Sequence, residues 1–300
     1  MPDPEPDTGQ TVELASADVR SALAGGREPN LPAHPDELRE RLPGLEPERH
    51  VTDWGRSERV EGLLDRTVYE FLFHYWFRVE VEGIENVPRE GGALLVANHA
   101  GALPPDGPMI AKAVKERHPR PRPVHLVTQT RFNHAPGLGM LLTKLGAVPA
   151  HPANIQRLLF DERQLVLAFP EGSSGARKPI RERYRLRPFA ADPAIESALR
   201  ARAPIVPLAV LGAEEAAPAL AALRAPLGRI LRLPRVPIAP ALPLPAKFRI
   251  RFLEPVQTDR RGSAPWRDRG LVQALTHDLR ALIQENLLEL VAARRSVWLG

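Results

Sequence analysis

A histidine and an aspartate lie close together directly after an apolar run of the chain. Leu94–Val96 is followed by Asn98 and His99, and Asp106 comes seven positions after the histidine. A neutral imidazole held by a carboxylate can take a proton from a hydroxyl group near pH 7, which is the task of a general base. The structural alternative makes Asp106 the cap of a helix expected from Pro108, with His99 as a polar loop residue. One aspartate can fill both roles, because a carboxylate has two oxygens.

A second polar loop follows another apolar run, at residues 165–169. It reads Pro170-Glu171-Gly172 and continues into Ser173, Ser174 and Gly175. It is either an ordinary strand-to-turn junction or a ligand loop, whose backbone N–H groups and Glu171 side chain lie beside the end of the first strand. A third apolar run, led by proline, covers residues 204–210.

The periodicity of apolar residues predicts strands that alternate with helices. The expected strands are 79–82, 93–97, 123–128, 147–149, 164–169, 205–210 and 248–252. The expected helices are 57–78, 108–117, 138–145, 153–161, 194–203, 214–223 and 268–293. This alternation is typical of an α/β fold, with a layered sheet flanked by helices. His99 and Glu171 then both follow the carboxyl ends of strands, where such folds place functional groups.

The chain divides into a tail and one domain. Residues 1–50 are rich in Pro, Asp, Glu, Arg and Gly, so we expect a largely disordered, flexible N-terminal tail with at most a short helix at 36–41. Residues 51–300 are expected to form the domain, which includes a long C-terminal helix.

Several classes of site are absent from the sequence. The 300 residues contain no cysteine, which excludes a thiolate nucleophile, a disulfide framework and a Cys-type metal site. The histidines show no metal-ligand spacing, so we expect no metal. No apolar run is long enough for a transmembrane helix, and the first ten residues lack the basic start and apolar core of a signal peptide. We expect a cytoplasmic protein whose membrane contact is peripheral.

The chain is basic, with a formal net charge of +5 that comes mostly from arginine. Codon bias accounts for this as well as anionic partners do, and nucleic acid is the weakest partner because no zinc-finger spacing, RNP-type motif or dense basic arm is present. A run of basic residues follows the Glu171 loop: Arg177, Lys178, Arg181, Arg183 and Arg185. It is either a solvated face or a phosphate-binding set, in which Arg177 is the residue nearest the loop.

Two apolar segments are candidates for contact with a membrane surface. Residues 69–77 are rich in aromatic side chains, so one side of a helix there is expected to pack on the sheet and part of the rest to meet lipid. Residues 227–247 are apolar, interrupted by proline and dotted with arginine, which suits neither a regular helix nor a regular strand. This stretch is either a buried irregular segment or an apolar flap with basic flanks. The C-terminal helix is expected to belong to the core.

Taken in order, the three loop segments resemble the glycerolipid acyltransferase superfamily of bacterial lysophosphatidic acid (1-acylglycerol-3-phosphate) acyltransferases. That family carries an Asn-His-…-Asp block, a Phe-Pro-Glu-Gly block and a Pro-Ile-Val-Pro block. Here they correspond to Asn98–Asp106, Phe169–Gly172 and Pro204–Pro207. The resemblance extends over residues 72–253.

The resemblance implies direct transfer of an acyl group from a thioester to a lipid hydroxyl. His99 would be the general base, Asp106 would orient it, and no covalent acyl-enzyme would form. The substrate would be bound by residues of the first two blocks and by Arg177: Asn98, Gly101, Phe169, Pro170, Glu171, Gly172 and Ser173. No cofactor is implied, since acyl-CoA or acyl carrier protein serves as co-substrate. The implied partners are the acyl donor, the lipid acceptor and an anionic membrane surface.

Two departures from the family pattern leave the acceptor open. Six residues separate His99 from Asp106 instead of the usual four, as in a subgroup that resembles acyltransferases of neutral glycerides. Because residues seven apart in a straight helix are about 10 Å apart, Pro104-Pro105 must turn the chain back. The stretch 146–151 also lacks the arginine that meets an acceptor phosphate in the family. The acceptor is therefore a lysophospholipid, a neutral glyceride or an unusual lipid, or the chain binds lipid without turnover.

Overall fold

One mixed β-sheet organises the part of the chain that the structure describes. The computed structural model describes residues 52–99, 105–129, 137–176, 178–189, 193–218, 221–223, 236–238, 242–259 and 264–300. Within these ranges seven strands form the sheet, in the order β1-β9-β6-β2-β5-β3-β4. They are β1 (Glu80–Glu82), β2 (Ala93–Ala97), β3 (Val124–Thr128), β4 (Ala147–Pro149), β5 (Leu165–Ala168), β6 (Ile205–Leu211) and β9 (Arg249–Phe252). The expected tail, residues 1–50, lies outside the described residues.

The five strands β6, β2, β5, β3 and β4 run parallel to one another. β9 is antiparallel to β6, and β1 pairs with β9 in parallel. In the register of the central pair, Val96 of β2 lies opposite Ala168 of β5. Both strands therefore end at the same edge, and the segments that follow them begin side by side.

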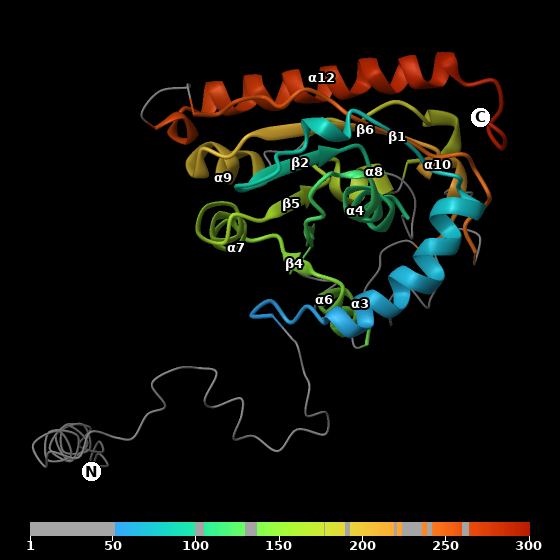
Figure 1. Ribbon diagram of the computed structural model, residues 1–300. Helices are drawn as coiled ribbons and strands as arrows, with labels where there is room; N and C mark the ends of the chain where they lie inside the picture. Colours follow the sequence, from blue (N-terminus) through green and yellow to red (C-terminus); the bar gives the residue numbers. More distant parts are fainter. Residues whose placement is uncertain are drawn as a thin grey trace, which may run out of the picture. The chain divides into compact units, whose positions relative to one another are not determined.

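Helices cover both faces of this sheet (Figure 1). They are α3 (Glu58–Leu64), α4 (Asp106–Arg117), α6 (Leu138–Lys144), α7 (Pro152–Gln156), α8 (Gly172–Ala176), α9 (Pro193–Ala201), α10 (Ala213–Ala216) and α12 (Arg269–Ala293). Wider π-helical turns follow α3 and α7, at Asp65–Tyr69, Leu72–Trp76 and Arg157–Asp161. Short 3₁₀ turns are found at Ile84–Asn86, Ile180–Glu182 and Pro265–Arg267. The observed architecture is the α/β layered sheet that the alternating pattern predicts.

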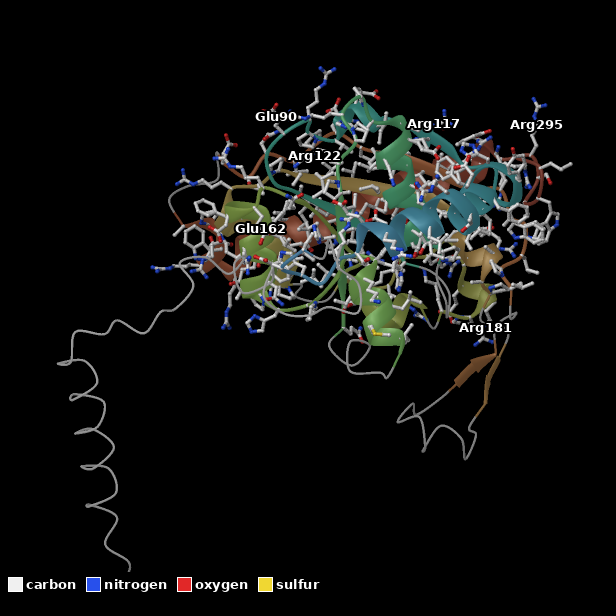
Figure 2. The ribbon with its side chains drawn as sticks, turned by 60° about the horizontal axis from the view of Figure 1, so that its bottom comes forward. Glu90, Arg117, Arg122, Glu162, Arg181 and Arg295 are labelled. Carbon is white, nitrogen blue, oxygen red and sulfur yellow. The ribbon has the colours of Figure 1, made fainter. Side chains whose placement is uncertain are left out.

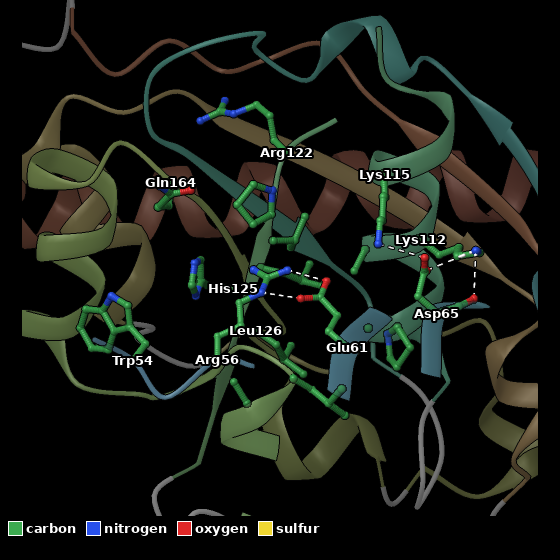
Figure 3. A pocket seen from close by; sticks show the side chains of 18 of the residues that line it. Trp54, Arg56, Glu61, Asp65, Lys112, Lys115, Arg122, His125, Leu126 and Gln164 are labelled. Atoms are coloured by element: carbon green, nitrogen blue, oxygen red, sulfur yellow. Dashed lines mark hydrogen bonds and ion pairs between the residues drawn. The ribbon is translucent and has the colours of Figure 1, made fainter. Parts of the chain in front are cut away.

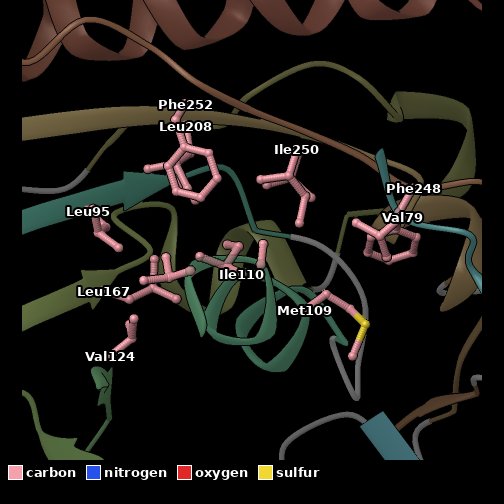
Figure 4. Close-up of a cluster of buried hydrophobic side chains, with 14 of the residues drawn as sticks. Val79, Leu95, Met109, Ile110, Val124, Leu167, Leu208, Phe248, Ile250 and Phe252 are labelled. Carbon is pink, nitrogen blue, oxygen red and sulfur yellow. The ribbon is translucent and has the colours of Figure 1, made fainter. Parts of the chain in front are cut away.

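Two apolar cores lie on opposite faces of the sheet because side chains alternate along each strand. Leu95 and Leu167 join the core that packs on α4 and on Phe73 and Phe77 (Figure 4). Leu94 belongs to the other core, which the sheet shares with α9 and α12. A strand buried on both faces reads as a continuous apolar run, which explains the uninterrupted sequence of β2.

The C-terminal helix α12 is part of the second core, as expected. Asp268 caps its first turn by accepting a hydrogen bond from the Leu271 backbone N–H at 3.1 Å. Its buried residues recur every three or four positions: Leu275, Leu279, Ile283, Leu287 and Leu290. This stripe lies against the sheet. None of the helices in the described ranges is both long and apolar enough to span a bilayer.

The sequence predictions fail in two places. The helix expected over 214–223 ends at Ala216, and Ala221–Leu223 is instead a strand, β7, paired with β8 (Val236–Ile238). Pro218 explains the early end, since proline lacks the N–H that a helix interior requires. The view that no strand suits 227–247 is wrong at β8. The helix expected over 57–78 is present without a break from Glu58 to Trp76, and it widens into two π-helical turns after α3.

Close backbone packing makes Gly92, just before β2, a sensitive position. A Cβ atom there would lie 2.0 Å from the carbonyl oxygen of Leu159. We expect Gly92→Ala to lower the free energy of unfolding by about 1–3 kcal/mol through this overlap, measured by urea unfolding. Gly62→Ala is the matched control, because the nearest atom to its Cβ lies 3.8 Å away and alanine favours the helix. Equal stability of the two variants would contradict the packing.

Candidate active site

Asn98 fixes the point at which the chain leaves the sheet after β2. Its side-chain Nδ2 donates to the carbonyl oxygen of Val210 at 2.9 Å, and its Oδ1 accepts from the Val210 N–H at 2.8 Å. The amide group thus extends the hydrogen bonding between β2 and β6 by one further pair of bonds, as a backbone amide would. With 1% of its surface exposed, Asn98 holds the loop in place from inside the protein.

His99 and Asp106 are in direct contact. The Nδ1 atom of the imidazole lies 3.0 Å from Oδ2 of the aspartate, although six residues separate them. Asp106 is the first residue of α4, after Pro105 at the N-cap position, so the chain does bring it back to the histidine. The residues between, 100–104, lie outside the described residues.

The burial of the pair is unequal. The Asp106 side chain is 1% exposed, and its other oxygen accepts from the Gly107 N–H at 2.8 Å. The His99 side chain keeps 16% of its surface exposed. Because a carboxylate only accepts hydrogen bonds, Nδ1 is the atom that donates to Asp106. When the ring is neutral, this contact places the lone pair on Nε2, where it is free for proton transfer.

Phe169 and the first turn of α4 enclose the imidazole. The rings of His99 and Phe169 stack with centroids 4.4 Å apart and an interplanar angle of 29°. The first turn of α4 packs close to this ring, because a Cβ placed on Gly107 would lie 3.9 Å from Phe169 and 3.4 Å from Leu126. Stacking restricts the imidazole to one plane, in which Nδ1 faces Asp106.

Glu171 joins the loops that follow β2 and β5. One carboxylate oxygen accepts from the backbone N–H of His99 at 3.0 Å, and the other accepts from that of Arg187 at 2.7 Å. Lys178 approaches the second oxygen at 3.3 Å, and the Glu171 side chain is fully buried. A Cβ on Gly175 would lie 3.0 Å from the carbonyl oxygen of His99, so α8 packs directly on the histidine backbone.

A second buried carboxylate completes this network. Lys178 lies 2.6 Å from Oε1 of Glu214, and Oε2 of Glu214 accepts from the Tyr184 N–H at 2.5 Å. Burial raises the pKa of Glu214, although the positive charge of Lys178 opposes the rise. Neither residue was singled out for this role from the sequence. The available signal was that Lys178 is the one lysine in a run of arginines.

The structure brings most of the predicted site residues to one edge of the sheet. These residues are Asn98, His99, Asp106, Phe169, Pro170, Glu171 and Gly172. The backbone of Ser173 belongs to α8, whereas Gly101 and Arg177 lie outside the described residues. The remaining basic residues of the run behave as a solvated face: Arg181, Arg183 and Arg185 are exposed, and Arg181 points away from the body (Figure 2).

One cluster has side chains of metal-binding type, namely Glu70, His74 and Glu116. Lys112 already lies 2.7 Å from each of the two glutamates. Burial alone would lower the pKa of Lys112, but its hydrogen bonds to Glu116, Glu70 and Asp65 outweigh burial and raise it. The ammonium group therefore pairs with both carboxylates of this cluster and ties α4 to the segment that follows α3.

A cavity of about 580 Å³ lies beside the first turn of α4. Gly107 and Pro108, the residues directly after Asp106, form part of its wall. Most of the rest of the wall comes from the chain around α3 and from α4, β3 and α6 (Figure 3). Ala147 of β4, Leu167 of β5 and the nearby Glu162 and Gln164 complete it. Its side chains include apolar, aromatic and charged groups.

Comparison with known proteins agrees with this geometry. Residues 78–211 match a family model described as Acyltransferase. An uncharacterised protein of Mycobacterium tuberculosis is 38% identical over 272 residues, which cover 88% of this chain and 75% of the relative. An uncharacterised protein of Mycobacterium leprae is 37% identical over 272 residues, with 88% and 73% covered.

A solved structure shares the fold. The 1-acyl-sn-glycerophosphate (LPA) acyltransferase PlsC from Thermotoga maritima superposes with a TM-score of 0.52 over 80% of each chain, at 18% sequence identity. The family model covers β2, β5 and β6 together with the loops that carry His99, Asp106 and Glu171. The chain therefore belongs to the same family as these mycobacterial proteins, carries a segment that matches the Acyltransferase model, and shares the fold of PlsC.

Proposed function

We propose that this protein transfers a fatty acyl group from an acyl thioester to the hydroxyl group of a glycerolipid. The contact of 3.0 Å between His99 Nδ1 and Asp106 Oδ2 carries the proposal. It holds a partly exposed imidazole at the carboxyl edge of a parallel sheet, where α/β folds bind their ligands. The donor is acyl-CoA or acyl carrier protein, which is consumed as a co-substrate.

The proposed chemistry is a single direct transfer. Nε2 of His99 takes the proton of the acceptor hydroxyl, and the oxygen attacks the thioester carbonyl. A C–O bond forms as the C–S bond breaks, and the departing thiolate receives the proton back from the imidazolium. Asp106 orients His99 and stabilises its charged form. A covalent intermediate on cysteine is excluded by composition.

Asn98 and Glu171 fit a positioning role better than the substrate contact implied by the family resemblance. Asn98 is committed to Val210, and the Glu171 carboxylate is committed to His99, Arg187 and Lys178. Both residues therefore hold the backbone at His99 in place, and through it the imidazole that would meet the substrate. Phe169 remains a residue that a bound acyl group would meet, because it stacks on the imidazole.

The doubt about turnover arose from the longer spacing between His99 and Asp106. Since the two side chains meet at hydrogen-bond distance, that reason for a non-catalytic lipid-binding protein falls away. The acceptor phosphate has no cation to meet in the stretch 146–151, where His151 accepts from the Ala153 N–H at 3.2 Å and caps α7. A neutral glyceride or an unusual lipid is therefore the favoured acceptor over a lysophospholipid.

The same proposal includes peripheral binding to an anionic membrane. In the segment 69–77, Phe73 and Phe77 are fully buried, while Phe71 and Tyr75 are 51% and 70% exposed. Further exposed apolar side chains lie on α3 and on α6, which pack against each other: Leu63, Leu138, Met140 and Leu141. Aromatic and aliphatic groups of this kind insert at the boundary between water and lipid.

We expect His99→Ala to lower the rate of acyl transfer by about 10²–10⁴-fold, because the general base is lost. The measurement is transfer from a radiolabelled acyl-CoA to a panel of lysophospholipids and glycerides. His277→Ala on the exposed side of α12 is the matched control and should retain full activity. A folded His99→Ala protein with turnover near that of the wild type would refute the proposed role.

Vesicle flotation tests the membrane contact. The wild-type protein should float with anionic vesicles, and raised salt should weaken the binding. Phe71→Ser combined with Tyr75→Ser should reduce binding by about tenfold or more, since two exposed apolar side chains are removed. Leu288→Ser, a change at an exposed leucine of α12, is the control. Equal flotation of all three proteins, or none by the wild type, would count against this surface.

A further inference from the structure

The cavity beside the first turn of α4 has a wall with equal numbers of basic and acidic side chains. Its volume of about 580 Å³ is in the range that holds a small ligand. Four basic and four acidic side chains line it: Arg56, Lys112, Lys115, Arg122, Glu58, Glu61, Asp65 and Glu162. A phosphate group entering the cavity would meet no net positive field.

The cations of the wall are also committed to partners. Arg56 forms a two-pronged ion pair with Glu61, with both N–O distances at 2.6 Å. Asp65 lies 3.2 Å from Lys112 and 2.9 Å from Lys115 (Figure 3). Arg122 donates to three backbone carbonyl groups. The wall therefore resembles a set of fixed hydrogen-bonding dipoles more than an anion site.

Two buried nitrogen atoms of the wall have no hydrogen-bond partner among the described residues. They are Nη1 of Arg56 and Nδ1 of His125, in residues that are 8% and 4% exposed. Both side chains contact Gly146: Arg56 Nη1 would lie 3.4 Å from a Cβ placed there, and the imidazole bonds to its backbone. The two orphan nitrogens thus belong to one small region.

The chemical roles of these two atoms are complementary. Arg56 Nη1 can only donate a hydrogen bond. Burial, together with the charge of Arg56, lowers the pKa of His125 to about 4, so the imidazole is neutral at pH 7. Its other nitrogen donates to the Gly146 backbone, which leaves Nδ1 as an acceptor. A hydroxyl group both donates and accepts, whereas a phosphate dianion or a carboxylate only accepts.

We propose that this cavity binds an uncharged, hydroxyl-bearing part of the lipid acceptor, with Arg56 donating to it and His125 accepting from it. The group is a glycerol or a sugar moiety. Trp54 and Tyr69, which also line the cavity, supply aromatic surface for its C–H groups. This inference rests on the proposed acyl transfer, because it places the acceptor's head group in the cavity whose wall includes Gly107, the residue after Asp106.

Binding without an acyl donor tests the inference by isothermal titration calorimetry on the full chain. The probes share a six-carbon chain: 1-hexanoylglycerol, hexyl glucoside, 1-hexanoylglycerol 3-phosphate and methyl hexanoate. We expect at least one of the two neutral hydroxylated probes to bind about tenfold more tightly than the phosphate and the methyl ester. Which of the two binds better identifies a glycerol or a sugar as the source of the hydroxyl group.

Variants assign the binding to the two nitrogens. Arg56→Lys keeps a cation beside Glu61 but removes Nη1, and His125→Phe keeps the ring but removes Nδ1. Each should weaken the preferred neutral probe by about tenfold, while Arg59→Lys, on the exposed side of α3, should leave it within about twofold. Thermal unfolding shows which variants fold. If neither variant folds, the order in which the wild-type protein binds the four probes decides whether the inference holds.

Two results would overturn the inference: tighter or equal binding of the phosphate or the methyl ester, or unchanged binding in both folded variants. The outcome is separable from that of the proposed function. Selective binding by a protein that transfers no acyl group would keep the site and remove the enzyme activity. Acyl transfer without this selectivity would keep the enzyme activity and remove the site.

Discussion

The parallel register of β2 and β5 is the constraint on which the candidate site depends. Because Val96 lies opposite Ala168, the two strands end together, and the loops after them begin as neighbours. His99 and Glu171 are 72 residues apart in sequence, yet the carboxylate of one accepts from the backbone of the other at 3.0 Å. A slip of this register would separate the imidazole from the groups that hold it.

Buried polar groups then convert this juxtaposition into a fixed geometry. Asn98, Asp106 and Glu171 are each almost fully buried, and each carries hydrogen bonds to the backbone. Leaving such a group without a partner costs about 1–3 kcal/mol, so the loops cannot shift freely. Lys178 balances the charge of Glu171 and connects it to Glu214 in α10, the short helix after β6. Among Asn98, His99, Asp106 and Glu171, His99 alone keeps a partly exposed side chain, as a proton acceptor requires.

Local sequence patterns predicted the elements but not the polar contacts between them. Two strands, at 93–97 and 147–149, and the long helix α12 follow from the spacing of apolar residues and from the turn-forming residues at their ends. The helix over 214–223 failed because its alanines favoured helix while Pro218 and strand pairing prevailed. The role of Lys178 depends on Glu171 and Glu214, and no local pattern reports a contact between distant segments. The return of Asp106 to His99 was required by the chemistry and is met by the start of α4.

The central claim is that Asp106 acts through His99, and a double-mutant cycle measures this most directly. The kcat/KM values of His99→Ala, Asp106→Ala and the double variant are compared with that of the wild type, with folding checked by circular dichroism. If the two residues act as one unit, the double variant is no slower than His99→Ala alone. If the two losses multiply instead, Asp106 contributes independently of the imidazole, and the account of the pair is wrong.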